Sequence, residues 1–218
     1  MSADRKLVLF HGPKTRSTGV FILLEELGAP YDLRLVNMKI MEHRQPAFLA
    51  INPMGKVPAI LHGDALVTEQ GAIYIYLADL FPKAGLAPAL DDPLRGPWLR
   101  WLVFYGSCVE PACVDRAQKR EPGPLPMSPY GTFEAMLGTI IGQLRKGPYL
   151  LGERFSAADI LYGTAMSWMT RFKIVPEEPE IMDYVQRVSS RASFARVNAL
   201  DAKYVAEHEA VAKAAGKS

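Results

Sequence analysis

The sequence predicts an α/β domain followed by an all-helical domain. Strand and helix signals alternate over residues 1–80, whereas from Asp91 onward the apolar residues recur only at helical spacing. Between these stretches, residues 81–90 contain prolines and a glycine that interrupt helical periodicity. We therefore expect one domain over residues 1–80, a linker over 81–90 and a second domain over 91–218.

The elements of the first domain follow from short runs bounded by turn residues. Apolar and β-branched runs predict strands at Leu7–Phe10, at Tyr31–Val36, from Val57 onward and at Ala65–Val67. Helical apolar spacing predicts helices that end near Leu27, that lie near Ala47–Ala50 and that span Glu69–Leu80. This βαβ, α, ββα order is the thioredoxin-like arrangement.

The second domain begins with an apolar stripe at helical spacing, which predicts a core helix: Leu94, Trp98, Trp101, Leu102 and Tyr105. Pro111 is expected to bend or end that helix. Four prolines and Gly123 within Glu121–Pro129 predict a loop. Further on, Ser156-Ala157-Ala158-Asp159 is typical of a capping box at the start of another helix.

Charge and cysteine content exclude several classes of function. The 25 basic and 23 acidic residues give a net charge of +2 with no long block of one sign, so nucleic acid is not an expected partner. Cys108 and Cys113 form neither a C-x-x-C redox motif nor a zinc set, so no metal is expected. The sequence has no signal-peptide pattern and no apolar run of about 20 residues, which predicts a cytoplasmic protein without a membrane span.

Val57-Pro58 predicts a docking place for a small peptide. A proline at the start of a strand has no N–H for the sheet ladder, and a cis bond there would turn the backbone of Val57 outward. Val57 would then offer its N–H and carbonyl to an extended ligand.

The turn at Thr68–Gln70 predicts a binding site for the charged end of the same ligand. Thr68 is a suitable N-cap, which places Glu69 and Gln70 in the first turn of a helix. The unpaired N–H groups there favour a carboxylate, to which the Gln70 amide can also donate, while Glu69 can hold an amine.

Five segments, in their order and spacing, together resemble the glutathione S-transferase family: Leu7–Phe10, Leu23–Gly28, Asn52–Pro58, Glu69–Ile73 and Phe155–Ile160. The resemblance implies a thioredoxin-like glutathione-binding domain and a helical domain that contributes a hydrophobic substrate pocket. It also implies glutathione as co-substrate, a small hydrophobic electrophile as the second substrate, and a homodimer. The implied activity is that of a transferase in detoxification.

The loop between the first strand and first helix should ionise the glutathione thiol, and it departs from the family. Lys14 stands where many members have a catalytic serine, and Arg16 where others have a cysteine. We expect Ser17 to contact the sulfur, because a hydroxyl, a backbone N–H and the helix dipole can act together there. Thr15 is a second hydroxyl, Ser17 as a simple N-cap is the alternative, and the Lys14 and Arg16 cations offer another route to a lower thiol pKa.

The remaining site residues are expected from the resemblance. Lys56 and Arg44 are candidates for the glycine carboxylate of glutathione, beside Lys14, Val57, Pro58, Glu69 and Gln70. The substrate pocket is expected to include Phe104, Tyr105, Cys108, Trp168 and Phe172. His11 and His62 have no carboxylate pattern near them in the sequence, so a structural or surface role is expected for both.

Three functions stay open at this point. Glutathione conjugation comes first, because the segments that resemble the transferases cover nearly the whole chain. A glutathione-dependent disulfide or peroxide reductase is the second, since some bacterial relatives without the usual serine are similar. A non-catalytic binding protein with the same fold is the third, because the residue expected at the thiol is missing.

Overall fold

The computed structural model describes residues 6–121 and 123–216, which form two compact units. One unit runs through Ile73 and takes up the chain again from Arg191, and the other is Tyr74–Ser190. The expected division at residues 81–90 differs from these units in two respects. The second unit begins at Tyr74, within the helix Gln70–Leu80. The last helix, expected in the second domain, is grouped by its contacts with the first unit.

A four-stranded mixed sheet forms the centre of the first unit, in the order β2-β1-β3-β4. Strand β1 (Leu7–His11) pairs in parallel with β2 (Asp32–Leu35) and antiparallel with β3 (Ala59–His62). Strand β4 (Ala65–Val67) completes a hairpin with β3. Together with the helices between these strands, this topology confirms the predicted thioredoxin-like fold.

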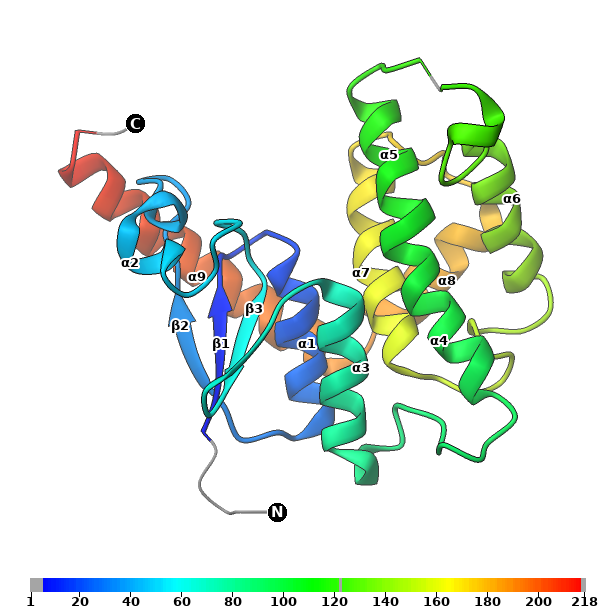
Figure 1. Cartoon of the computed structure of the whole chain (residues 1–218), viewed down its shortest axis with the longest axis horizontal. Coiled ribbons are helices and arrows are strands. Elements are labelled where there is room, and N and C mark those ends of the chain that lie inside the picture. Colours follow the sequence, from blue (N-terminus) through cyan, green and yellow to red (C-terminus); the bar gives the residue numbers. More distant parts are fainter. Residues whose placement is uncertain (1–5, 122, 217–218) are drawn as a thin grey trace. The chain divides into compact units, whose positions relative to one another are not determined.

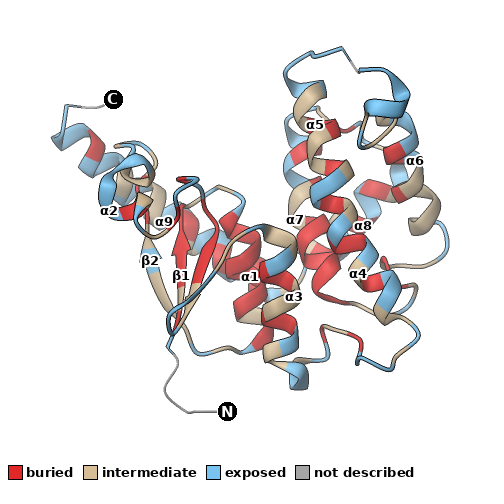
Figure 2. Cartoon of the chain, viewed as in Figure 1, coloured by how far each residue is buried: buried red, intermediate tan, exposed pale blue. Residues whose placement is uncertain are grey.

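The first unit also contains helices: α1 (Ser17–Leu27), the one-turn α2 (Pro46–Leu49), the first residues of α3 (Gln70–Leu80) and the long α9 (Ala192–Ala214), with a 3-10 turn at Glu42–Arg44. Helix α1 contacts both β1 and α9 (Figure 1). Because it is covered from two directions, its residues from Ser17 to Leu24 are all buried (Figure 2). Helix α1 is therefore the central helix of this unit.

A small apolar cluster supports the loop before β3. Phe10, Val36, Phe48, Val57 and Ala59 form it from four different segments. The Phe10 and Phe48 rings meet edge to face, with centroids 5.9 Å apart. This cluster anchors the side chain of Val57 and so fixes the position of its backbone.

The second unit is helical: α4 (Arg95–Phe104), α5 (Glu110–Ala117), α6 (Phe133–Leu144), α7 (Ala157–Arg171) and α8 (Pro179–Ser189), with 3-10 turns at Pro82–Ala84 and Leu125–Met127. Helices α7 and α8 lie side by side, and a Cβ added at Gly163 would stand 2.4 Å from Val188 Cγ1. The absence of a side chain at Gly163 permits this close approach. The all-helical character predicted from the sequence is confirmed.

The expected effect of Pro111 is partly wrong. The chain neither breaks nor ends there; a π-helical turn at Tyr105–Val109 joins α4 to α5. Proline has no N–H for helical pairing, and its ring clashes with a carbonyl one turn earlier. A widened turn just before Pro111 accommodates both effects.

The capping box at the start of α7 is confirmed. Asp159 is completely buried and accepts hydrogen bonds from the Ser156 N–H (2.9 Å), the Leu150 N–H (2.8 Å) and the Tyr184 hydroxyl (3.0 Å). One carboxylate thus joins the loop, the helix start and α8.

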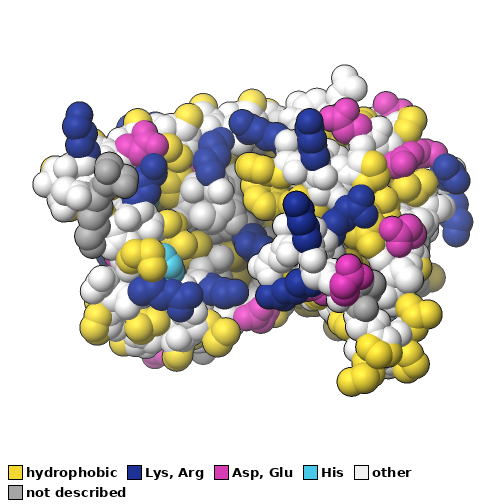
Figure 3. All heavy atoms as spheres, turned by 90° about the horizontal axis from the view of Figure 1, so that it is seen from above, with side chains coloured by type: hydrophobic (Ala, Val, Ile, Leu, Met, Phe, Trp, Pro, Cys, Tyr) yellow, Lys and Arg dark blue, Asp and Glu magenta, His cyan; other side chains and the backbone are white. Residues whose placement is uncertain are grey.

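The surface shows dispersed charge. On the face drawn in Figure 3, Lys and Arg side chains lie at several places, with hydrophobic and acidic side chains among them. Within residues 6–121 and 123–216, no helix combines the length and apolar character of a transmembrane span. The same part of the chain has no cluster of three or more His, Cys, Asp or Glu side chains arranged to hold a metal.

Candidate active site

The backbone of Val57 is available for a ligand. The Val57–Pro58 bond is cis, and the β3 ladder begins only at Ala59, opposite Phe10. No described residue forms a hydrogen bond with the N–H or carbonyl of Val57. An extended peptide could therefore pair with this residue without displacing an existing bond.

Hydrogen bonds hold the loop before Val57 in place. The Asn52 side chain donates to the Lys56 carbonyl (2.9 Å) and accepts from the Met54 N–H (3.1 Å). Gly55 has a φ of +59°, and a Cβ there would lie 2.8 Å from the His43 carbonyl, so only glycine fits. Lys56 is exposed on this loop.

Arg44 contributes to the same loop. Its Nη1 donates to the Met54 carbonyl at 3.2 Å, and the side chain stays exposed. The guanidinium can still bind a carboxylate through its other N–H groups, since it carries five donors.

The start of α3 differs from the prediction by one residue. The helix begins at Gln70, and Glu69, not Thr68, is the N-cap, because its carbonyl accepts from the Ile73 N–H at 2.9 Å. Glu69 is exposed and has a φ of +63°, which is uncommon for a residue with a side chain. Its side chain is available to an incoming amine.

Gln70 has one satisfied and one unsatisfied end. Its Nε2 donates to the Arg16 carbonyl at 3.2 Å, so this donor is turned toward the thiol loop and not toward a ligand carboxylate. Its Oε1 is buried and has no hydrogen-bond partner among the described residues. A buried acceptor without a partner costs about 1–3 kcal/mol, so this atom favours a ligand that donates a proton there.

Ser17 does not occupy the expected position at the sulfur. It is the first residue of α1 and has no exposed surface, and the N-cap is Arg16, which makes no side-chain capping bond. The Ser17 hydroxyl lies 2.8 Å from His11 Nδ1 and accepts from the Gly12 N–H at 3.0 Å. The N-cap alternative is wrong, since the N-cap is Arg16, and the lack of exposed surface argues against direct contact of Ser17 with a ligand sulfur.

Thr15 is the hydroxyl that reaches the surface of this loop. It is half-buried, donates to the Gly12 carbonyl at 2.7 Å and lies 2.8 Å from Ser17 Oγ. Lys14 and Arg16 on either side are exposed, and Lys14 has a φ of +58°. The loop therefore presents one hydroxyl flanked by two cationic side chains.

His11 has a carboxylate partner that the sequence analysis missed. Its Nε2 lies 2.7 Å from Asp201 Oδ1 on α9, and both side chains are completely buried. Asp201 also accepts from the Thr18 hydroxyl (2.6 Å) and the Lys14 N–H (2.9 Å). Burial acts to raise the pKa of Asp201, but these bonds and the charge of His11 hold the pKa below its usual value.

The predicted substrate-pocket residues divide into two groups. Tyr105 is 3% exposed and packs edge to face against Tyr162, so it is a core residue. Trp168 and Phe172 are exposed, with ring centroids 4.6 Å apart. Phe104 and Cys108 are half-buried, and the Cys108 thiol donates to the Pro129 carbonyl.

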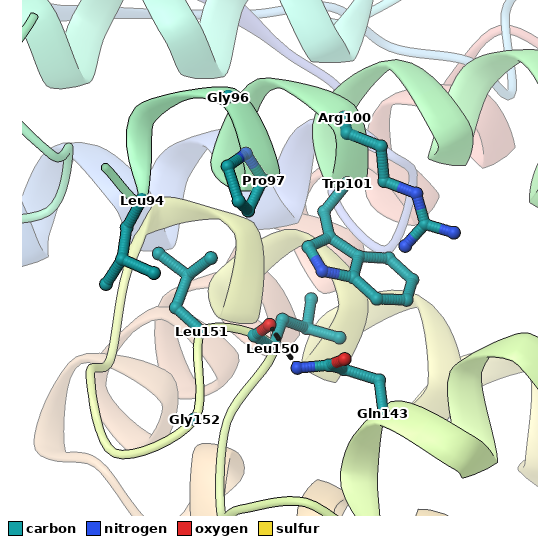
Figure 4. A pocket seen from close by; sticks show the side chains of 9 residues that line it. All are labelled: Leu94, Gly96, Pro97, Arg100, Trp101, Gln143, Leu150, Leu151 and Gly152. Carbon is teal, nitrogen blue, oxygen red and sulfur yellow. Dashed lines mark hydrogen bonds between the residues drawn. The ribbon is translucent and has the colours of Figure 1, made fainter. Parts of the chain in front are cut away.

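A hollow of about 580 Å³ in the second unit lies elsewhere and contains none of these five residues. Its wall includes Arg100, Trp101 and Leu150, and the Gln143 amide donates to the Leu150 carbonyl at 2.9 Å (Figure 4). The Arg100 guanidinium stacks on the Trp101 ring at 3.9 Å.

Comparison with known proteins follows the same two-part organisation. Residues 5–79 match the family model of the glutathione S-transferase N-terminal domain, and residues 130–192 that of the C-terminal domain. The chain belongs to the glutathione S-transferase family.

Two curated members of the family are similar over most of their length. The glutathione S-transferase-like protein gedE of Aspergillus terreus is 30% identical over 203 residues, covering 82% of this chain and 88% of gedE. The disulfide-bond oxidoreductase YfcG of Escherichia coli is 28% identical over 199 residues, covering 84% of this chain and 90% of YfcG. These two relatives carry different names, one a glutathione S-transferase-like protein and the other a disulfide-bond oxidoreductase.

Solved structures of the family agree in fold. A glutathione transferase from Methylococcus capsulatus superposes with a TM-score of 0.75 at 28% identity, covering 90% of this chain and 98% of its own. A glutathione transferase homologue from Sulfitobacter, with bound glutathione, gives a TM-score of 0.70 at 32% identity, with 88% and 96% covered.

Proposed function

We propose that this chain binds glutathione in its first unit and adds the glutathione thiolate to small hydrophobic electrophiles. Two hydrogen-bonding groups of the first unit carry the proposal. The Val57 N–H and carbonyl, and the buried Gln70 Oε1, have no hydrogen-bond partner among the described residues. The first fits the peptide backbone of glutathione, and the second fits a donor on the ligand. The glutathione bound to the Sulfitobacter homologue supports this assignment.

The ends of glutathione have suitable partners. The γ-glutamyl amine would donate to Glu69 and Gln70 Oε1, and the adjacent carboxylate would accept from N–H groups in the first turn of α3. Lys56 and Arg44, both exposed, would hold the glycine carboxylate.

The thiol requires moderate activation. Lowering its pKa from about 8.5 by about two units needs roughly 2.7 kcal/mol in favour of the anion. A hydrogen bond from Thr15 and the positive charges of Lys14 and Arg16 act in this direction. We assign the sulfur contact to Thr15, because this residue is partly exposed whereas Ser17 has no exposed surface.

The second substrate would meet apolar side chains of the helical unit. Among the predicted residues, the exposed aromatic pair Trp168 and Phe172 is the most accessible to a ligand. We also propose that the protein is a homodimer, as the family resemblance implies.

The test of glutathione binding is calorimetry, with a conjugation assay for activity. We expect binding by the unmodified protein and formation of a thioether with a small aromatic electrophile. Val57→Pro removes the backbone N–H that would pair with the ligand, and we expect it to abolish binding. A second valine-to-proline change, such as Val185→Pro, would break α8 and cannot serve as a control. The control is Val211→Ala, at an exposed position of α9.

A reductase that uses glutathione disulfide is the second candidate, favoured by the similarity to YfcG and by the absence of serine or cysteine at positions 14 and 16. Tighter binding of glutathione disulfide than of glutathione, together with disulfide reduction and no conjugation, would establish this alternative. Tight glutathione binding without thiolate formation would instead indicate a non-catalytic binding protein.

A further inference from the structure

Four polar side chains form a continuous chain behind the thiol loop. Thr15 Oγ1 lies 2.8 Å from Ser17 Oγ, Ser17 Oγ lies 2.8 Å from His11 Nδ1, and His11 Nε2 lies 2.7 Å from Asp201 Oδ1. The three inner members are completely buried, and Thr15 is half-buried. One end of the chain is therefore accessible and the other is a fixed negative charge.

The chemistry of these groups limits the direction of the inner bonds, and the Gly12 carbonyl, 3.0 Å from Ser17 Oγ, is a second acceptor for the Ser17 proton. A carboxylate only accepts, so His11 Nε2 carries a proton and donates it to Asp201. In neutral His11, Nδ1 is then an acceptor and takes the Ser17 O–H. Ser17 Oγ can in turn accept from the Gly12 N–H and from the Thr15 O–H.

Thr15 Oγ1 already accepts from the Ser17 N–H at 3.2 Å, which leaves one lone pair on the hydroxyl of this partly exposed residue for a ligand. When its own proton points inward to Ser17 or to the Gly12 carbonyl, Thr15 can accept a bond from a thiol S–H but cannot donate one. Stabilising a thiolate needs the opposite direction, with the Thr15 O–H pointing outward. The hydroxyl chain must therefore reverse for the thiol to ionise.

We propose that the Thr15–Ser17–His11–Asp201 chain is a proton relay that carries the glutathione thiol proton to His11, an inference that rests on the proposed glutathione binding. The sulfur gives its proton to Thr15 Oγ1, the Thr15 proton passes to Ser17 Oγ, and the Ser17 proton passes to His11 Nδ1. The products are a thiolate that accepts from Thr15 and an imidazolium paired with Asp201. No proton leaves the protein in these steps.

Each group has a distinct part in this relay. Thr15 touches the reacting sulfur and is the catalytic residue, whereas Ser17 connects it to His11. His11 receives the proton through them, and Asp201 is a positioning residue that orients the imidazole and stabilises its charged form. After the sulfur has become a thioether, the proton returns along the same path to the leaving group or to water.

The surroundings of His11 contain few other charges. The Phe21 ring of α1 packs against the imidazole edge to face, with centroids 5.2 Å apart. Asp201 is the acidic group in contact from α9, and on the same helix the pKa of His208 is affected by the charge of His11. Burial lowers the pKa of His208, the charge of Glu42 acts to raise that pKa, and the charge of His11 acts to lower it further.

The first test uses the unmodified protein and measures proton release when glutathione binds. Calorimetry in buffers of different ionisation enthalpy gives the number of protons released, and ultraviolet difference absorbance gives the fraction of bound thiolate. We expect bound thiolate near pH 7.5 with release close to zero, since the relay keeps the proton on His11. Thiolate formation with release of about one proton per site would overturn the relay.

The second test uses variants of the relay residues. It measures the midpoint, which is the pH at which half of the bound glutathione is thiolate. His11→Gln keeps a hydrogen-bonding side chain but cannot take the proton, and Ser17→Ala interrupts the connection. We expect each to raise the midpoint by about one unit or more. The double variant should raise it no further than one single change, because both interrupt the same path.

Thr170→Val is the matched control. It removes the hydrogen bond of a buried hydroxyl to the Met166 carbonyl, at 2.8 Å, in the second unit and contacts no member of the relay. We expect it to lower the melting temperature yet leave the thiolate midpoint within about 0.3 unit. An unchanged midpoint in folded, glutathione-binding His11→Gln would disprove the relay, whereas failure of the unmodified protein to bind glutathione would instead disprove the proposed function.

Discussion

At the scale of single residues, the Gln70 side chain is hydrogen-bonded at one end and open to a ligand at the other. Its Nε2 donates to the Arg16 carbonyl in the thiol loop, whereas its buried Oε1 has no hydrogen-bond partner among the described residues. One residue thus connects the glutathione seat with the loop that must activate the thiol. Replacing it should affect binding more than folding.

We expect Gln70→Leu to raise the dissociation constant for glutathione about five- to tenfold, because it loses a hydrogen bond worth about 1 kcal/mol to the ligand. Calorimetric titration measures this change. Gln186→Leu, at an exposed position of α8, serves as the control. Equal affinities of Gln70→Leu and the unmodified protein would show that Oε1 does not meet the ligand.

Some residues of the candidate site could be predicted because their information is local. Val57-Pro58 and Glu69-Gln70 are adjacent pairs whose meaning follows from proline geometry and helix ends. The His11–Asp201 pair joins residues 190 positions apart, and no pattern in the sequence near His11 indicates this partner. The burial of Ser17 was equally hidden, since it depends on α9 closing over the start of α1.

At the scale of secondary-structure elements, α7 is organised by one buried carboxylate. Asp159 accepts from backbone N–H groups and from the Tyr184 hydroxyl. Burial raises the pKa of Asp159 to about 6, against the opposing effect of these hydrogen bonds. The capping box was readable from the sequence, but its bond to α8 was not.

Asp159→Asn should destabilise the protein by about 2–4 kcal/mol, because an amide cannot accept all of these bonds. The effect should depend on pH. Since the pKa is higher in the folded state, folding binds the proton, and the stability from this group is full below about pH 4 and falls as pH rises through 6. Chemical denaturation should show a larger deficit of the variant at pH 4.5 than at pH 7.5; a deficit that grows with pH would contradict the assignment.

The crossing of α7 and α8 gives a second prediction at this scale. Gly163→Ala would place a methyl group 2.4 Å from Val188 Cγ1, and we expect a loss of about 1–3 kcal/mol from overpacking. Gly138→Ala on α6, where nothing lies within 4 Å, should be neutral or stabilise by up to about 1 kcal/mol. Thermal denaturation of both variants separates packing from helix propensity, and equal melting temperatures would refute the close-contact explanation.

At the scale of the whole molecule, the predicted combination of a thioredoxin-like part and an all-helical part is correct. The first unit, however, consists of two separate segments of the chain. The change from alternating strands to continuous helices is visible in the sequence. The return of α9 to the first unit is not, because helical spacing alone does not say which core a helix joins. Phe194 and Val197, at 4% and 0% exposure, are the large apolar side chains that the described part of α9 buries, and Ala212 is a smaller one.

A chain ended after Ser190 should therefore lose glutathione binding. It would lack the α9 side chains that cover α1, each worth about 1.5–3 kcal/mol, and it would lack Asp201. Calorimetry and hydrogen exchange of residues 6–73 would show the effect, with a chain ended after Ala214 as the control. Binding by the shorter chain at unchanged affinity would show that α9 is dispensable.

Light scattering gives a further measurement at this scale. If the protein is a homodimer, it should elute with a mass twice the 24.1 kDa of one chain. A monomeric mass at the concentrations of the binding assay would contradict the proposed assembly.

The position of α9 also has a consequence for synthesis on the ribosome. Chains emerge in the direction from N-terminus to C-terminus, so β1 and α1 leave the exit tunnel before the helical unit, and Asp201 leaves after it. The first unit therefore lacks α9 until the helical unit, Tyr74–Ser190, has emerged. The unit that contains β1 begins to emerge before the helical unit, yet it is complete only after the helical unit.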